Sequence, residues 1–273
     1  MFESLLLPLA LDVRADGPGP KMIESYSLTD RGCVRAYNED LVFTDHSLLL
    51  FVVADGMGGH HHGARAAELA VSSVRYYLES SQDRFDVTWP FGYNFELSID
   101  ANRLSTSIQI ANRQVWRQAE ESPEFSGMGT TVAALLISGY NAVVANVGDS
   151  RVYLFRKGEL SQLTYDDTFL NTALPEHALA PHERLNHPMR NVLTQAAGSK
   201  GGIDVHIQER TLQSDDLFLI SSDGLHGVVG DAGMRAILQT GENLERTAHR
   251  LLQAASGMGA PDNVSCVLVN YSI

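Results

Sequence analysis

The stretch LLLFVVADGMGG, residues 48–59, is an apolar run that ends in an Asp-Gly pair at 55–56. A second stretch, LFLISSDGL at residues 217–225, repeats the arrangement with an Asp-Gly pair at 223–224. Short apolar runs rich in Val, Ile and Phe are typical of buried strands. A glycine lets the chain turn sharply and expose its own carbonyl. Each stretch therefore predicts a carboxylate beside a free backbone oxygen at the rim of a sheet. Such oxygens are the ligands that Mg²⁺ and Mn²⁺ prefer.

Three more acidic sites lie beside predicted strands. Glu39-Asp40 precedes a strand expected at 41–44, Asp149 lies in a short turn between strands, and Asp262 precedes the last strand. If these strand ends converge with the two Asp-Gly pairs, they form a cluster of like charges that repels itself without a counter-ion. Two or more divalent cations would remove that repulsion and supply a hydroxide nucleophile near neutral pH. The alternative is that each Asp is an ordinary turn residue. The number of sites and the repeated Asp-Gly form favour a metal site.

The composition allows a large core and restricts the partners. The chain has 273 residues, 44% of them hydrophobic, which permits one or two domains. Its formal net charge of −13 argues against binding nucleic acid or an anionic membrane. Cys33 and Cys266 form no metal or redox motif. Two free thiols in a cytosolic protein are expected, with a single disulfide as the alternative.

The first 21 residues are predicted to be an extension outside the fold, followed by one domain at 22–273. The apolar segment 5–11 is too short to span a bilayer, and no Lys or Arg precedes it as in a secretion signal. The sequence DGPGP at 16–20 then interrupts regular structure. Met22 is an alternative start. We find no apolar run long enough for a membrane anchor.

Further along the chain, the pattern predicts antiparallel sheets covered by helix pairs. Two long helices follow one another without an intervening strand, unlike a strict βαβ alternation, and short connections between strands indicate antiparallel neighbours. Helices are predicted at 64–79, 98–120, 234–239 and 244–255. Strands are predicted at 23–29, 41–44, 48–54, 130–137, 142–147, 151–156, 203–211, 216–222 and 264–270. Residues 164–196 are an irregular polar stretch.

Six motifs in order resemble the bacterial form of the type 2C metal-dependent serine/threonine protein phosphatases. They are RAYNED at 35–40, VADGMGGH at 53–60, GMGTT at 127–131, NVGDSR at 146–151, SDG at 222–224 and DN at 262–263. The resemblance covers residues from about 24 to 272. One Asp-Gly pair is weak support, whereas six ordered motifs are specific. The resemblance implies an α+β fold, an α-β-β-α sandwich of two antiparallel sheets flanked by helix pairs, with metals in a cleft at one edge.

The resemblance also implies the ligands of two or three Mn²⁺ or Mg²⁺ ions. Asp55 would bridge two metals, with Asp223 and Asp262 on one and the Gly56 carbonyl on the other. The remaining acidic residues would have outer positions: Glu39 and Asp40 would hold metal-bound waters or bind at the second site, and Asp149 would form a weaker third site with Asp223.

Arg35 would bind the substrate phosphate, for which a guanidinium fork is well shaped. The alternative is a surface ion pair with Glu39. The general acid is unassigned, because eukaryotic relatives have a His directly after the Asp-Gly and this chain has Met57. Candidates are a metal-bound water and the three histidines His60, His61 and His62. The alternative is that these histidines only begin the following helix in solvent.

The polar stretch 164–196 corresponds to the family's variable flap beside the active site. Its substrate-flap residues Asp166, Asp167 and Thr168 stand where bacterial relatives often have Asp-His-Ser, whereas HPMRNVLT at 187–194 matches better. Long loops in compact domains are usually functional or mobile. We therefore expect substrate choice to depend on this flap.

The function implied is hydrolysis of phosphoserine and phosphothreonine in proteins, by in-line attack of a metal-bridging water. Ser221 and Ser222 are interpreted as turn residues rather than nucleophiles, because no His is placed beside them in the sequence and no G-x-S-x-G motif is present. The expected partners are a phosphorylated protein and a cognate Ser/Thr kinase, with no nucleic acid and no membrane anchor. We expect a cytoplasmic monomer. The alternatives are a metal-dependent phosphohydrolase of small phosphate esters and a non-catalytic binding module on the same fold.

Overall fold

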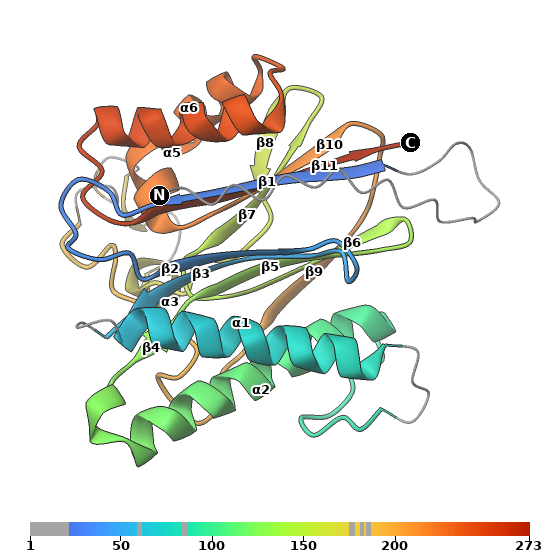
Figure 1. Cartoon of the computed structure of the whole chain (residues 1–273), viewed down its shortest axis with the longest axis vertical. Coiled ribbons are helices and arrows are strands. Elements are labelled where there is room, and N and C mark those ends of the chain that lie inside the picture. Colours follow the sequence, from blue (N-terminus) through green and yellow to red (C-terminus); the bar gives the residue numbers. More distant parts are fainter. Residues whose placement is uncertain (1–21, 59–61, 83–86, 175–177, 181–182, 184–186) are drawn as a thin grey trace.

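Two antiparallel sheets pack face to face, and a helix pair covers the outer face of each (Figure 1). The computed structural model describes residues 22–58, 62–82, 87–174, 178–180, 183 and 187–273. The predicted extension at 1–21 lies outside the described residues, as do His60 and His61. The predicted α-β-β-α sandwich is confirmed.

The first sheet has the strand order β1-β11-β10-β7-β8. Its strands are β1 (Met22–Asp30), β11 (Val264–Ser272), β10 (Asp216–Ser221), β7 (Arg151–Arg156) and β8 (Glu159–Gln162). The helices α5 (Asp223–Leu238) and α6 (Leu244–Gly257) cover its outer face.

The second sheet has the order β2-β3-β5-β6-β9, with the short strand β4 paired to β3. Its strands are β2 (Asp40–Asp45), β3 (Leu50–Met57), β4 (Gly129–Thr130), β5 (Val132–Ser138), β6 (Asn141–Val147) and β9 (His206–Thr211). The helices α1 (His62–Ser81) and α2 (Ile99–Glu121) cover it. Two short helical pieces complete the description: η1 (Pro123–Phe125) and α3 (Phe169–Ala173).

The apolar run that begins the second sheet explains the layering. Successive side chains of a strand point to opposite faces. In β3, Leu50 and Val52 pack under α1 and α2, whereas Phe51 and Val53 pack against the first sheet. Because both faces of β3 are buried, the run is continuously apolar rather than alternating.

Several details differ from the sequence-based expectation. The stretch 164–196, predicted to be irregular, contains α3, and the strand predicted at 130–137 is divided into β4 and β5. Helix α5 begins at Asp223, eleven residues before the predicted 234, and is kinked at Gly230. Its first part forms because Leu225 and Val229 bury their side chains against the first sheet despite Gly227 between them. Strand β9 begins at His206 rather than at 203. Strand β8 was not predicted, since its sequence ELSQ carries one apolar residue and its pairing comes from a tight connection to β7.

Candidate functional site

Five aspartates from both sheets meet at one end of the sandwich. Asp40 begins β2 and lies directly opposite Asp55 on β3 in the strand ladder. Asp149 lies in the turn between β6 and β7, so it sits where the chain passes from one sheet to the other. Asp223 begins α5 directly after β10, and Asp262 precedes β11. The structure therefore brings together the residues that the sequence singled out, whereas their roles as ligands stay predictions.

Loss of water and mutual repulsion disfavour the ionised form of four of these carboxyls. Burial raises the pKa of Asp55 well above its ordinary value, and the charges of its acidic neighbours, Asp40 first, raise it further. Burial likewise raises the pKa of Asp40 to about 6 and that of Asp149 to about 8. Burial and the charge of Asp262 raise the pKa of Asp223. Such a cluster is stable as a set of anions only when cations balance it.

The free lone pairs of the cluster fit a hard divalent cation. One oxygen of Asp40 accepts hydrogen bonds from the hydroxyls of Ser222 (2.8 Å) and Ser265 (2.6 Å), whereas its Oδ1 is buried and has no partner among the described residues. The Oδ1 of Asp223 is likewise buried without a partner there. In the described part of the chain, no group of three or more acidic, His or Cys side chains is arranged so that it could hold a metal ion as it stands. Carboxylate oxygens left unsatisfied in this way are suited to Mg²⁺ or Mn²⁺.

The two Asp-Gly glycines allow close backbone approach and do not form turns, which corrects the expectation. Gly56 continues strand β3 and pairs with Thr130. A Cβ on Gly56 would lie 2.2 Å from the carbonyl oxygen of Gly63, at the start of α1. Gly224 belongs to the first turn of α5, and a Cβ there would lie 1.9 Å from the carbonyl oxygen of Asn263. Glycine is needed because two backbones meet at each position.

Arg35 lies on the loop between β1 and β2 and forms an ion pair with Asp262. Its Nη2 donates to Asp262 Oδ2 at 2.6 Å, with both side chains partly exposed. The alternative pair with Glu39 is wrong, because Glu39 Oε1 accepts the backbone N–H of Gly63 at 3.0 Å. The hydrogen bond to Asp262 raises the pKa of Arg35, as do the nearby charges of Asp55 and Asp223. A fixed positive charge thus stands at the edge of the acidic cluster.

His62 is the one histidine of the predicted trio that the structure describes. It begins α1 and packs edge-on against the ring of Phe125, with ring centroids 5.5 Å apart. The assignment of a general acid among the three histidines stays a prediction.

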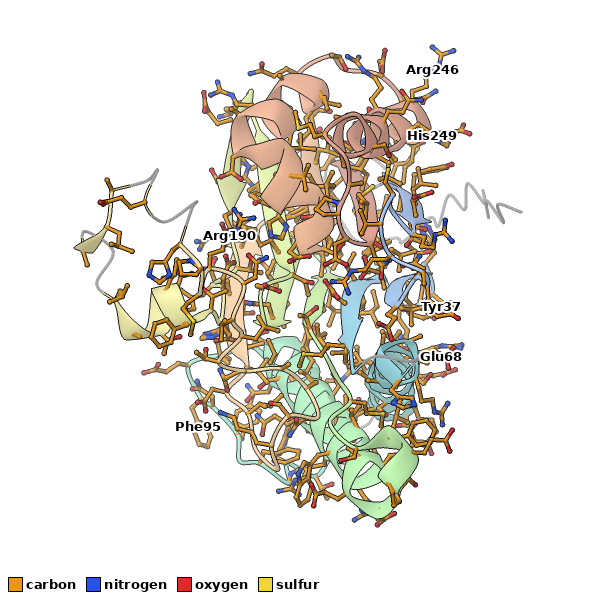
Figure 2. The ribbon with its side chains drawn as sticks, turned by 90° about the vertical axis from the view of Figure 1, so that its left-hand side faces the viewer. Tyr37, Glu68, Phe95, Arg190, Arg246 and His249 are labelled. Atoms are coloured by element: carbon orange, nitrogen blue, oxygen red, sulfur yellow. The ribbon has the colours of Figure 1, made fainter. Side chains whose placement is uncertain are left out.

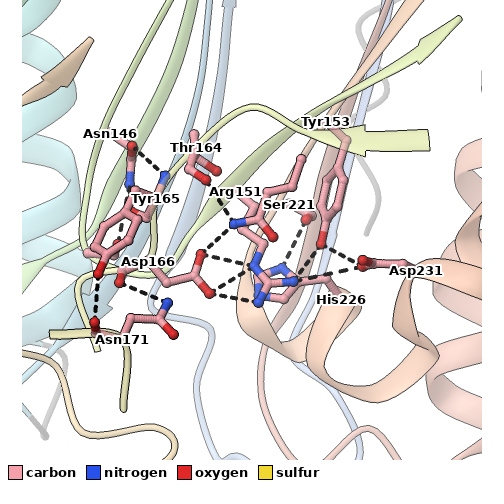
Figure 3. Close-up of polar contacts among 12 residues, drawn as sticks. Asn146, Arg151, Tyr153, Thr164, Tyr165, Asp166, Asn171, Ser221, His226 and Asp231 are labelled. Atoms are coloured by element: carbon pink, nitrogen blue, oxygen red, sulfur yellow. Dashed lines mark hydrogen bonds and ion pairs between the residues drawn. The ribbon is translucent and has the colours of Figure 1, made fainter. Parts of the chain in front are cut away.

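The base of the flap is anchored by two consecutive buried aspartates, Asp166 and Asp167; Figure 3 shows the contacts of Asp166. Asp166 accepts hydrogen bonds from Nε and Nη2 of Arg151, at 3.0 Å and 2.6 Å. Asp167 accepts the backbone N–H of Gly148 at 2.9 Å and contacts His206 Nε2 at 2.8 Å. Asp166 therefore binds the flap to the first sheet, and Asp167 binds it to the second.

Arg151, the last residue of the NVGDSR motif, has a role that the sequence did not predict. Its Nη1 donates to the hydroxyl of Tyr153 at 2.7 Å, and that hydroxyl donates to Asp231 on α5 at 2.9 Å. Figure 3 shows this row of contacts running from the flap to α5. Its position in the sequence could have indicated a place near the acidic cluster, because Arg151 follows Asp149 by two residues.

A cavity of about 460 Å³ separates the acidic cluster from the flap. Its wall includes Asp149 and Asp223 on one side and Thr168 and Arg190 of the flap on the other. Figure 2 views this end of the sandwich and places Arg190 and Tyr37, from the Arg35 loop, on opposite sides of it. Three of the five clustered aspartates, Asp149, Asp223 and Asp262, thus line the cavity.

A Ser–His pair lies beside this cavity, although the two residues are not neighbours in the sequence. His226, five residues after Ser221, places its Nδ1 3.0 Å from the Ser221 hydroxyl. Ser221 is fully buried, however, and burial lowers the pKa of His226 well below its ordinary value. Ser222 is also buried and donates its hydroxyl to Asp40. Neither serine is exposed to attack a substrate.

Comparisons with known proteins agree over most of the chain. The family model described as protein phosphatase 2C matches residues 36–268. The serine/threonine protein phosphatase PstP of Mycobacterium tuberculosis is 35% identical over 242 residues, which are 89% of this chain and 44% of PstP. The serine/threonine phosphatase stp of Listeria welshimeri is 34% identical over 248 residues, 90% of this chain and 94% of stp. The chain thus spans less than half the length of the mycobacterial relatives and nearly all of the Listeria one.

Solved structures are similar over the same region. The catalytic domain of PstP in complex with two manganese ions has a TM-score of 0.78 and 31% identity, covering 93% of this chain and 100% of that one. Stp1 from Staphylococcus aureus has a TM-score of 0.79 and 29% identity, covering 95% and 99%.

Proposed function

The chain belongs to the protein phosphatase 2C family, and from that premise we propose that it hydrolyses phosphoserine and phosphothreonine in proteins with two or three Mn²⁺ or Mg²⁺ ions. The observation that carries the proposal is the cluster of five aspartates. Asp40, Asp55, Asp149 and Asp223 have raised pKa values. Asp40 and Asp223 each keep a buried carboxylate oxygen without a partner among the described residues. Carboxylates that repel one another in this way are stabilised by bound cations, and clusters of perturbed pKa values are typical of functional sites.

The ions, when bound, would activate a water and neutralise negative charge on the phosphate. Asp55 and the Gly56 carbonyl would hold them from the second sheet, and Asp223 and Asp262 from the first. Asp40 and Glu39 would orient waters beside them, and Asp149 with Asp223 would form a weaker site.

Arg35 would bind the equatorial oxygens of the phosphate. In the structure its guanidinium pairs with Asp262, and both side chains are partly exposed. A surface ion pair of this kind contributes little free energy. Arg35 can therefore leave Asp262 and bind a phosphate at a small cost in free energy. In the proposed reaction no serine or threonine of the described residues becomes phosphorylated. The hydroxyls of Ser221 and Ser222 agree with this, because both already make hydrogen bonds inside the fold.

We further propose that the substrate is a phosphorylated protein and that a Ser/Thr kinase is the opposing enzyme. We also propose that the chain is a monomer that acts in signalling in the cytoplasm. Support for a protein substrate comes from the relatives that are named serine/threonine protein phosphatases. In the parts of the chain that are described, no helix combines the length and apolar character needed to cross a membrane.

The test is hydrolysis of a phosphothreonine peptide by the purified chain, with Mn²⁺ and with EDTA. Phosphate release that requires Mn²⁺ is expected. Asp223→Asn should abolish it, whereas the control Asp215→Asn should not, because Asp215 is exposed and its positive φ of 67° suits Asn. Higher kcat/KM on small phosphate esters than on phosphopeptides would favour a small-ester phosphohydrolase. No release on any substrate would favour a binding module.

A further inference from the structure

The loop that carries Arg35, residues 31–39, buries none of its side chains. It joins Asp30 at the end of β1 to Asp40 at the start of β2, and most of its residues are exposed. Its apolar side chains point outward, since Val34 is 70% exposed and Tyr37 is 53% exposed. A loop without buried side chains opens easily unless hydrogen bonds restrain it. The position of Arg35 therefore depends on whatever binds this backbone.

One buried side-chain amide binds the loop on both sides of Arg35. The Nδ2 of Asn263 donates to the carbonyl oxygens of Arg31 and Tyr37, each at 2.9 Å. Its Oδ1 accepts the backbone N–H of Glu39, also at 2.9 Å. Asn263 is 6% exposed. An amide group offers two N–H donors and one carbonyl acceptor. Here both donated hydrogen bonds and the accepted one are made to the same loop.

The backbone of the same residue orients the partner of Arg35. The N–H of Asn263 donates to Asp262 Oδ1 at 2.8 Å, and the other oxygen of Asp262 accepts from Arg35 at 2.6 Å. The Asn263 carbonyl in turn lies against Gly224, directly after Asp223. Asn263 thus contacts the Arg35 loop, one predicted metal ligand and the neighbour of another.

We propose that Asn263 is a positioning residue that fixes the Arg35 guanidinium relative to Asp262 and Asp223. This inference rests on the proposed function, because Arg35 has phosphate to bind only in a phosphatase. Loss of the amide would release the Arg31 and Tyr37 carbonyls and the Glu39 N–H. The Cys33 N–H would still hold the loop through the Ala260 carbonyl at 2.9 Å, so the increased motion is expected mainly after Cys33, where Arg35 lies. Small displacements of a substrate-binding group can reduce catalysis about 100-fold.

The competing explanation is that Asn263 contributes only to stability, and the chain offers a matched control. Asn102 on α2 is also buried, at 4% exposure, and its Nδ2 donates to the carbonyls of Asn94 and Leu97 while its Oδ1 accepts the Asn94 N–H. It restrains residues 94–98, and the first four of these line a separate cavity. Asn102→Ala removes the same group from the same kind of contact at another loop.

The first measurement is hydrogen exchange of the full-length chain by mass spectrometry, which does not depend on activity. Asn263→Ala is expected to speed amide exchange within residues 31–39, and Asn102→Ala within 94–98. Unchanged exchange in 31–39 overturns the inference whether or not the chain is a phosphatase. Should Asn263→Ala not fold, Asn263→Asp keeps the acceptor for Glu39 and loses both donors.

The second measurement is a kinetic cycle with Arg35→Ala, on a phosphothreonine peptide at saturating Mn²⁺. Asn263→Ala should lower kcat/KM about 10- to 100-fold, with the larger share in KM, and Asn102→Ala should leave both near wild type. Arg35→Ala/Asn263→Ala should be no worse than Arg35→Ala alone, because the position of an absent guanidinium has no effect. Additive losses, or an unchanged KM in Asn263→Ala, would overturn the inference. An inactive wild type would instead count against the proposed function.

Discussion

Gly224 shows how a single residue without a side chain shapes the site. Its Cα faces the carbonyl oxygen of Asn263, so the first turn of α5 and the start of β11 approach more closely than any Cβ permits. The approach places Asp223 beside Asp262, whose charge raises the pKa of Asp223. The Asp-Gly form therefore reflects two needs: a carboxylate at the surface of the cleft and bare backbone behind it.

Gly224→Ala is expected to destabilise the fold by about 2–3 kcal/mol, because the new methyl group would lie 1.9 Å from a backbone oxygen. Gly227→Ala, one turn later in α5 where a Cβ meets nothing within 4 Å, is the control. It should gain about 0.5–1 kcal/mol from helix propensity. Urea unfolding of both variants measures the difference. Equal effects would contradict the close-approach explanation.

At the same scale, the sequence was informative about which residues meet and uninformative about their contacts. The aspartates could be found because charged residues after apolar runs are conspicuous. Three facts required the fold: Arg35 pairs with Asp262 and not Glu39, His226 lies beside Ser221, and Asn263 binds the Arg35 loop. Each joins residues that no periodic pattern relates, and the first and last are more than 220 positions apart.

Among the elements, the flap depends most on a few polar contacts. Its base is fixed by Asp166 and Asp167, which are 6% and 3% exposed and bind opposite sheets. A bidentate Arg–carboxylate pair is directional as well as strong. The flap can therefore vary in sequence beyond this base while the base keeps its place over the cavity.

Arg151→Met should destabilise the protein by about 2–3 kcal/mol, less than a fully buried ion pair, because Arg151 keeps some exposure while Asp166 is left buried without its partner. Cleavage of the flap by a low protease concentration should become faster. The control Arg117→Met removes an exposed pair with Glu121 on α2 and should change stability by less than about 0.5 kcal/mol. A similar small change in both variants would show that Arg151 does not anchor the flap.

The contact between His206 and Asp167 predicts a pH dependence. The hydrogen bond to Asp167 raises the pKa of His206 in the folded chain, and the charge of Asp204 acts in the same direction. The contribution to stability is therefore complete below the unfolded value of about 6.5 and is lost as pH rises through the raised pKa. Because His206 is partly exposed, we expect no more than about 0.5 kcal/mol.

The measurement is the difference in unfolding free energy between wild type and His206→Gln, from pH 5.5 to 8.5. The difference should be largest at the acidic end and shrink toward pH 8.5. Titrations elsewhere in the chain cancel in this difference. A gap that stays constant with pH would rule out a contribution from the charged imidazole.

The elements themselves were largely predictable. Nine strands and the helices of both pairs could be located from apolar spacing, because each buries one face or both. The first half of α5 could not, since its glycines at 224, 227 and 230 suggest turns, and Gly230 indeed has a positive φ of 69°. Buried side chains between the glycines decide for the helix. Strand β8 was missed because backbone pairing with β7, rather than side-chain pattern, creates it.

Taken as a whole, the molecule has its acidic cluster at the junction of its two sheets. Asp40 and Asp55 belong to the second sheet, Asp223 and Asp262 flank strands of the first, and Asp149 lies on the connection between them. Repulsion within the cluster pushes the sheets apart at this end, and the apolar layer between them opposes it. A cation held by residues of both sheets would reverse that force. Metal binding is thus expected to stabilise the entire fold and not only a loop.

Mn²⁺ at about 100 times its dissociation constant should add about 2.7 kcal/mol to the free energy of unfolding, if the unfolded chain binds it weakly. For a chain of this size, that corresponds to a rise in Tm of roughly 5–10 °C. Differential scanning calorimetry in EDTA and in Mn²⁺ measures the shift. Asp223→Asn should lose most of it, while its Tm in EDTA stays at or above that of wild type, because one of the repelling charges is gone. A variant with a lower Tm in EDTA and a full shift in Mn²⁺ would mean that Asp223 supports the fold and does not hold the ion. The two conditions together separate a ligand from a structural carboxylate, which activity alone cannot do.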